Sequence, residues 1–169
     1  AEVLTIEVTS VKDPTKSAIA SITVKQLTII DRLLINYTTE KAVAGVTAYE
    51  LTKELRMLAG KNISNGTENV AYCMNVYFRS YTEPNRGGTT KQIESEDTDL
   101  LDPNLYYYVN FEIRAKDGFD FKHDGTSFDT TSLTTVVNGE EMSGIADGSY
   151  NEYWRVIDLF IPIEIDTTS

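Results

Sequence analysis

The stretch LYYYVNFEIRAKDGFDF, residues 105–121, decides the fold class of this chain. Apolar and polar side chains alternate strictly along it, and one face carries Leu105, Tyr107, Val109, Phe111, Ile113 and Ala115. A period of two indicates a β-strand with one buried face. Asp117 and Gly118 then favour a turn. We therefore predict an all-β domain, a sandwich, with this strand in its core.

Two segments upstream of this strand carry the same alternation. Residues 27–37 (LTIIDRLLINY) predict an extended segment that bends at residues 31–32, where Asp and Arg interrupt the apolar pattern. Residues 70–79 predict a core strand in either of two registers. One register turns inward Tyr72, Met74, Val76 and Phe78, and the other turns inward Cys73, Asn75, Tyr77 and Arg79.

Two more strands are expected downstream. Residues 133–137 predict a short strand that closes on Asn138-Gly139, a favourable hairpin turn. Residues 146–148 (Ala-Asp-Gly) predict another turn, and residues 153–165 (YWRVIDLFIPIEI) predict a long last strand. Pro162 lies on the polar face of that strand. Because proline cannot donate to a ladder, this end of the strand is expected at a sheet edge.

One segment has a helical period instead. Thr47 followed by Glu50 is a capping box, leucines at 51, 55 and 58 recur at helical spacing, and Gly60 stands where a C-cap belongs. We predict a single short helix over about residues 48–59. Residues 80–104 show no period and contain proline, glycine and acidic residues, so we predict a long loop there.

The composition excludes several partners. A formal net charge of -11 gives a surface that repels phosphate backbones, so nucleic acid is not an expected partner. No apolar run is long enough to cross a bilayer, so we expect no membrane insertion. The single cysteine excludes an internal disulfide. A length of 169 residues suffices for one sizeable core, or for one domain plus a fragment of a neighbour.

Nothing in the sequence predicts an enzyme. His123 is the only histidine, so a serine or cysteine mechanism would have to run through it, and no nucleophile motif surrounds any serine. We interpret His123 as a solvated loop residue and Cys73 as a small buried hydrophobe.

Acidic residues gather in two segments and are the only candidates for a cofactor site, which would hold calcium. The first set includes Asp97, Asp99 and Asp102, with Glu94 and Glu96 beside them. The second set consists of Asp117, Asp120, Asp124 and Asp129. Neither matches the EF-hand spacing, and in an acidic protein such runs also occur as solvated loops.

Tyrosine is frequent, with ten residues in the chain. Tyr77, Tyr106 and Tyr108 fall on the outer face of their predicted strands and could form an aromatic surface for a carbohydrate or a protein. The alternative is that they pack cross-strand on the sheet.

The amino-terminal residues 3–24 predict a β-hairpin, because two alternating segments flank the turn residues Lys12 to Lys16. Within it, VTSVKDPTKSAIASITV at residues 8–24 resembles the last two strands of group 2 bacterial immunoglobulin-like domains, which end in "sxaDPtKsatatvtV". The resemblance implies that residues 1–26 are the terminal hairpin of a neighbouring immunoglobulin-like domain, whose earlier strands this sequence lacks.

A second resemblance covers residues 27–165. AVAGVTA at 42–48, RAKDGFDF at 114–121 and TTVVNGEEM at 134–142 are similar to a repeat unit of large surface proteins from Gram-positive gut bacteria. It implies an immunoglobulin-like β-sandwich over residues 27–169. The chain departs from the unit in lacking its proline near residue 41, in having Phe78 where tryptophan is usual, and in adding the helix.

Two functions are consistent with these resemblances. The first is a non-enzymatic module of a bacterial cell-surface or secreted protein, extracellular in location, which acts in adhesion, in carbohydrate or protein binding, or as a spacer. The second is a structural or decoration protein of a phage virion, in which the hairpin could complete a sheet of another subunit by strand addition.

Overall fold

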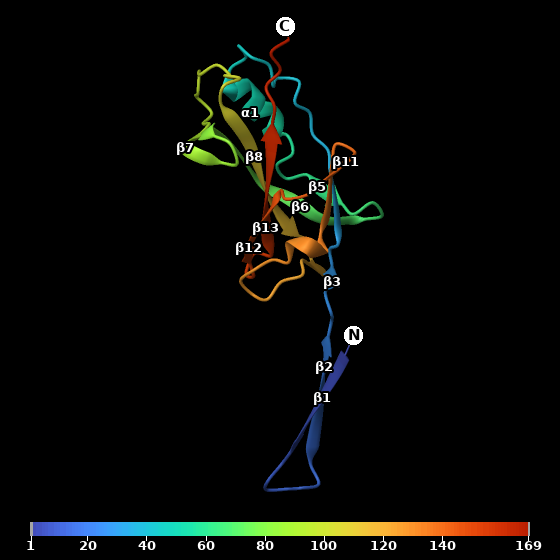
Figure 1. The fold of residues 1–169 in the computed structure, drawn as a ribbon. Helices are drawn as coiled ribbons and strands as arrows, with labels where there is room; N and C mark the ends of the chain where they lie inside the picture. Colours follow the sequence, from blue (N-terminus) through green and yellow to red (C-terminus); the bar gives the residue numbers. More distant parts are fainter. Residues whose placement is uncertain (1, 169) are drawn as a thin grey trace.

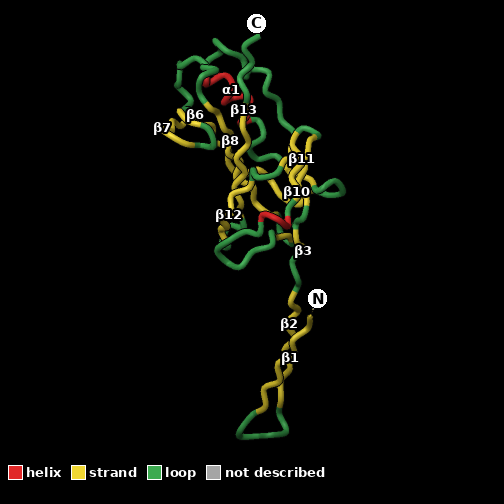
Figure 2. Tube along the Cα trace, viewed as in Figure 1, coloured by secondary structure: helices red, strands yellow, loops and turns green. Residues whose placement is uncertain are grey.

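The computed structural model describes residues 2–168 and confirms the all-β class. Figures 1 and 2 show two parts: a body built from strands with one α-helix, and a hairpin that projects away from it. The hairpin consists of β1 (Glu2–Thr9) and β2 (Ser17–Val24), which pair only with each other. The body begins at β3 (Thr28–Ile29), which pairs in parallel with β9 (Phe119–Asp120).

Nine strands of the body form one hydrogen-bonded sheet. Its order is β11-β10-β4-β5-β6-β8-β13-β12, with β7 paired to β6. The strands are β4 (Arg32–Ile35), β5 (Asn62–Ser64), β6 (Asn69–Glu83), β7 (Gly87–Gln92), β8 (Tyr106–Ala115), β10 (Thr134–Val137), β11 (Glu140–Met142), β12 (Ala146–Asn151) and β13 (Val156–Ile163). All pairings are antiparallel except that of β10 with β4.

The strand predicted from the alternating stretch is β8, and it lies between β6 and β13. Its inward side chains are almost fully buried, as the alternation predicts: Tyr107, Val109, Phe111, Ile113 and Ala115. The matching face of β13 buries Ile157, Leu159 and Ile161. Pairing of β13 with β12 ends at Leu159, so Pro162 lies where β13 has only β8 beside it, as predicted.

The sheet curls, so that the region of β4 packs against β8 within the core. The Tyr37 ring, just after β4, meets Phe111 of β8 edge to face at 5.2 Å between centroids. Short β5 links these two parts of the sheet, because it pairs with β4 on one side and β6 on the other. Segments that pack on opposite sides of the core therefore belong to one continuous ladder.

The predicted helix is α1 (Ala48–Arg56), which packs Leu51 and Leu55 into the core. The Thr47 hydroxyl accepts a hydrogen bond from the Glu50 N–H, as the capping box predicts. The helix ends earlier than predicted because residues 57–59 bond to carbonyls three residues back, which tightens the last turn. Within residues 2–168, no helix is long and apolar enough to span a bilayer.

A β-bulge explains why β6 has two apparent registers. Cys73 lies opposite Ile113 of β8, but Asn75 already lies opposite Glu112, so Met74 is an extra residue. Before the bulge Ala71 and Cys73 face the core, whereas after it Val76 and Phe78 do. Each predicted register therefore holds on one side of the bulge only.

Two loop predictions were wrong. Within the predicted loop 80–104, β6 continues to Glu83 and returns as β7 through a turn in which Asn85 and Arg86 have positive φ. Residues 146–148 lie in strand β12, and not in a turn. β7 is polar and mostly exposed, and β12 is mostly polar with Tyr150 as its one buried side chain, so their pairing leaves little apolar periodicity in the sequence.

Candidate functional site

The three predicted tyrosines lie on one face of the β6–β8 ladder but do not form one patch. Tyr106 and Tyr108 line a hollow of about 410 Å³ together with Pro162, whereas Tyr77 does not. The Tyr77 ring instead has the Arg79 guanidinium above it at 5.2 Å. Tyr81 packs edge to face on Tyr108 at 5.5 Å, so part of this face is occupied by cross-strand packing.

The first acidic set is organised around a lysine. Lys91 Nζ lies 2.7 Å from Asp97 and 2.5 Å from Asp99, and this contact holds the pKa of Asp97 below its usual value. The Asp102 carboxylate accepts instead from the N–H of Asn104. Two of the three predicted calcium ligands thus already share a protein cation, and calcium binding by this set stays a prediction.

The second acidic set is dispersed among separate partners. Asp117 pairs with Arg155 at 3.0 Å and Asp129 with Lys122 at 3.3 Å. Asp124 accepts backbone N–H groups of its own turn. Across residues 2–168, no three or more His, Cys, Asp or Glu side chains are arranged to hold a metal ion.

His123 is not the solvated loop residue that the sequence predicts. Its ring stacks on Tyr150 at 4.0 Å, and its Nε2 lies 3.1 Å from Asp120 Oδ2. The Gly125 N–H donates to Nδ1, so the hydrogen of the neutral ring sits on Nε2 and points at Asp120. Both ring nitrogens are engaged, which suits a structural tie and leaves none free for proton transfer.

Cys73 is buried, as predicted. Burial raises the pKa of its thiol to about 12, with a smaller contribution from the Glu112 carboxylate. A thiol with so little thiolate at neutral pH is a poor nucleophile.

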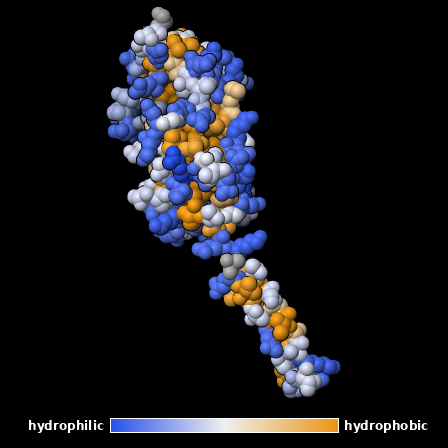
Figure 3. Space-filling model, turned by 90° about the vertical axis from the view of Figure 1, so that its right-hand side faces the viewer, coloured by the Kyte–Doolittle hydropathy of each residue, from blue (hydrophilic) through white to orange (hydrophobic). Residues whose placement is uncertain are grey.

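The hairpin presents an uncovered apolar face. Opposite pairs in its ladder place on one face the side chains Leu4, Ile6, Val8, Ala18, Ala20, Ile22 and Val24. The five largest of these, Leu4, Ile6, Val8, Ile22 and Val24, are 45% to 64% exposed. The other face carries mainly Thr, Ser and Glu. Figure 3 shows the apolar side chains along the projecting hairpin.

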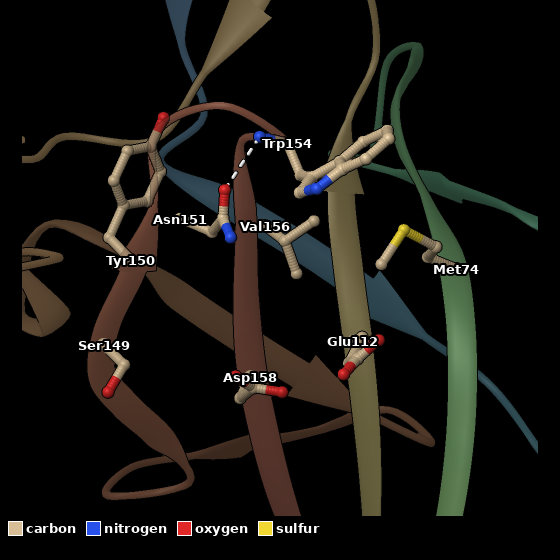
Figure 4. Close-up of a pocket in the computed structure, with 8 residues that line it drawn as sticks. All are labelled: Met74, Glu112, Ser149, Tyr150, Asn151, Trp154, Val156 and Asp158. Carbon is tan, nitrogen blue, oxygen red and sulfur yellow. Dashed lines mark hydrogen bonds between the residues drawn. The ribbon is translucent and has the colours of Figure 1, made fainter. Parts of the chain in front are cut away.

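The sequence analysis missed a hollow on the outer face of β8 and β13 (Figure 4), where Glu112, Trp154 and Asp158 come together. Only the strand register brings the two acids opposite each other. The one available signal was that both lie on the polar face of strongly alternating strands.

Comparison with models of known protein families, with curated proteins and with solved structures finds no match to this chain.

Proposed function

We propose that this chain is a non-enzymatic module of an extracellular assembly, and that its β1–β2 hairpin supplies the closing strands of a neighbouring immunoglobulin-like domain. In this proposal the body is itself an immunoglobulin-like sandwich that acts as a spacer. The observation that carries the proposal is the uncovered apolar face of the hairpin.

An isolated two-stranded hairpin is at best marginally stable in water. Covering a large apolar side chain contributes roughly 1.5–3 kcal/mol when burial is complete, and five such side chains lie about half exposed on one face. The body does not cover them, because β1 and β2 pair with no other strand in the described chain. The hairpin thus has the amphipathic character of a sandwich layer whose second layer comes from elsewhere.

The identity of the partner is supported by the sequence of the hairpin. Residues 8–24 resemble the last two strands of group 2 bacterial immunoglobulin-like domains, and such a domain buries one face of that hairpin against its other sheet. Strand addition of this kind joins modules through main-chain hydrogen bonds and apolar pockets. The same resemblances support a bacterial surface location.

The body supports a scaffold role. Its buried side chains form one apolar core, and Tyr37, just after β4, packs on Phe111 of β8 within it, which is compatible with two packed layers. The His123 and Tyr150 side chains are both hydrogen-bonded to Asp120, and Cys73 is buried with a raised pKa. Neither feature supports nucleophilic chemistry.

The test uses a group 2 immunoglobulin-like domain expressed without its two closing strands, together with the full chain. We expect a 1:1 complex by size-exclusion chromatography with light scattering, and slowed amide exchange in residues 2–24. Ile6→Asp, on the apolar face, should abolish the complex. Thr5→Asp, on the opposite face of the same strand, is the matched control and should preserve it.

Three outcomes would count against the proposal. One is absence of a complex with the truncated domain. Another is a complex that Ile6→Asp does not weaken. The third is a chain that self-associates through Ile6 in preference to binding the domain, which would identify a second copy of the chain as the occupant of the apolar face.

A further inference from the structure

A hollow of about 430 Å³ opens on the outer face of the body, between β12, β13, β8 and the bulge of β6. Its walls combine apolar and acidic side chains. Figure 4 shows Trp154, Val156 and Met74 at one end and the carboxylates of Glu112 and Asp158 at the other. Among residues 2–168, no lysine or arginine lines it.

The two carboxylates face each other across neighbouring strands. Asp158 of β13 is the direct register partner of Glu112 of β8. Like charges at such positions repel, which destabilises the sheet unless something neutralises them. Neither acid belongs to an ion pair within residues 2–168. Neither acid therefore has a direct ion-pair partner among the described residues, and Arg114, opposite Val156 in the same ladder, has its guanidinium over the Trp154 ring instead.

Amide groups fix the carboxylates but do not neutralise them. Asn75 Nδ2 donates to Glu112 Oε2 at 2.5 Å, and Asn110 Nδ2 donates to Asp158 Oδ1 at 3.1 Å. Each of these bonds engages one oxygen of its carboxylate and holds that side chain in place. The second oxygen of each carboxylate is left to accept hydrogen bonds from a ligand in the hollow.

The apolar end is also held in position. Trp154 is the only tryptophan of the chain and is 44% exposed. The backbone N–H of Trp154 donates to Asn151 Oδ1 at 2.9 Å, which fixes the turn that carries the indole. The Arg114 guanidinium lies 4.8 Å from the indole centroid and supports the ring. Val156 and Met74 complete an apolar surface beside it.

We propose that this hollow binds an organic cation, a primary ammonium group on an apolar stem, such as a lysine side chain of a partner protein. The ammonium donates to the free oxygens of Glu112 and Asp158 and removes their mutual repulsion. The stem lies on Val156 between Met74 and Trp154. The hydroxyl groups of a neutral sugar would donate hydrogen bonds to the same oxygens, but they would leave the two negative charges uncompensated.

The test titrates the full chain with n-pentylammonium and with 1-pentanol, its neutral analogue of the same length. Fluorescence of Trp154 reports binding directly, because no other tryptophan contributes. We expect a saturable change with the ammonium, weakened by added salt, and none with the alcohol at equal concentration. A capped Gly-Lys-Gly peptide is titrated in the same way as a second probe. Binding of the peptide identifies a protein lysine as the source, and binding of pentylammonium alone identifies a free amine.

Variants locate the site. Glu112→Gln and Asp158→Asn keep the shape of each side chain and should each weaken binding at least about tenfold by removing a charge next to the ammonium. Glu96→Gln removes an exposed carboxylate elsewhere and should leave binding unchanged. Thermal unfolding of each variant shows that it is folded. Removing one of two repelling charges is expected to preserve or raise the unfolding midpoint.

Equal binding of pentanol and pentylammonium would overturn the proposal in favour of a purely apolar site. Binding of methyl glucoside without binding of either amine probe would overturn it in favour of a carbohydrate site. Binding that Glu112→Gln and Asp158→Asn leave unchanged would overturn it as well. None of these outcomes bears on the hairpin, because no residue of the hollow lies in β1 or β2.

Discussion

The Tyr150 hydroxyl donates a hydrogen bond to Asp120 Oδ1 at 2.5 Å and so joins β12 to the end of β9. The same carboxylate accepts from the Phe121 N–H, and its other oxygen lies 3.1 Å from His123 Nε2. Asp120 is almost fully buried, so these bonds replace the water that it loses on folding. The network ties the segment from Asp120 to His123 to Tyr150, which is 30 residues further along the chain.

Tyr150→Phe should therefore destabilise the body. The change removes a hydrogen bond to a charged acceptor while keeping the ring that stacks on His123, so we expect a loss of about 1–3 kcal/mol in the free energy of unfolding. Urea denaturation followed by circular dichroism measures it. Tyr153→Phe is the matched control, since that ring is 81% exposed and should show no loss. Equal stability of the two variants would show that the network contributes nothing.

The buried Tyr37 hydroxyl should make the free energy of unfolding fall as the pH becomes alkaline. Burial raises the pKa of its hydroxyl to about 12, above its ordinary value of 10.0. The folded state thus holds this proton more tightly than the unfolded state. The contribution of the protonated Tyr37 hydroxyl to the free energy of unfolding is fully present below about pH 10 and is lost as the pH rises through about 12. Tyr37→Phe, which keeps the ring contact with Phe111, should flatten the decline in stability between pH 10 and 12. A wild-type slope in this variant would contradict the prediction.

Cys73 should resist alkylation in the folded chain. Its pKa of about 12 leaves little thiolate at pH 9, whereas the ordinary value of 9.0 in the unfolded chain leaves about half. We expect iodoacetamide at pH 9 to react at least about a hundredfold faster in denaturing urea than in buffer, as followed by mass spectrometry. Rapid modification of the native protein would mean that the thiol is accessible.

The hairpin should be dispensable for the stability of the body. β1 and β2 pair only with each other, and their side chains are exposed along their full length. A variant that begins at Leu27 should unfold at the same temperature as the full chain, within about 1 °C, by differential scanning calorimetry. A clear drop in the midpoint would show that the hairpin packs on the body in solution.

Local features of the sequence predicted much of the fold. The period of two in β8 and β13 identified their buried faces, because side chains of a strand alternate wherever that strand is placed. The Thr47 cap, the Asn138-Gly139 turn and the hairpin were predicted for the same reason, since each depends on residues near one another in the chain. The missed strands β7 and β12 lie in mostly polar segments where that signal is absent.

The tertiary structure decided what depends on residues far apart in sequence. The bulge at Met74 is visible only once β6 is aligned with β8. The stacking of His123 on Tyr150 and the meeting of Glu112 with Asp158 require the register of strands that are distant in the chain. Alternation fixes which face of a strand is apolar, whereas hydrogen-bond pairing with a partner strand fixes which residues stand opposite. The sequence by itself therefore determined the strands and their buried faces, and the pairing of those strands determined the candidate sites.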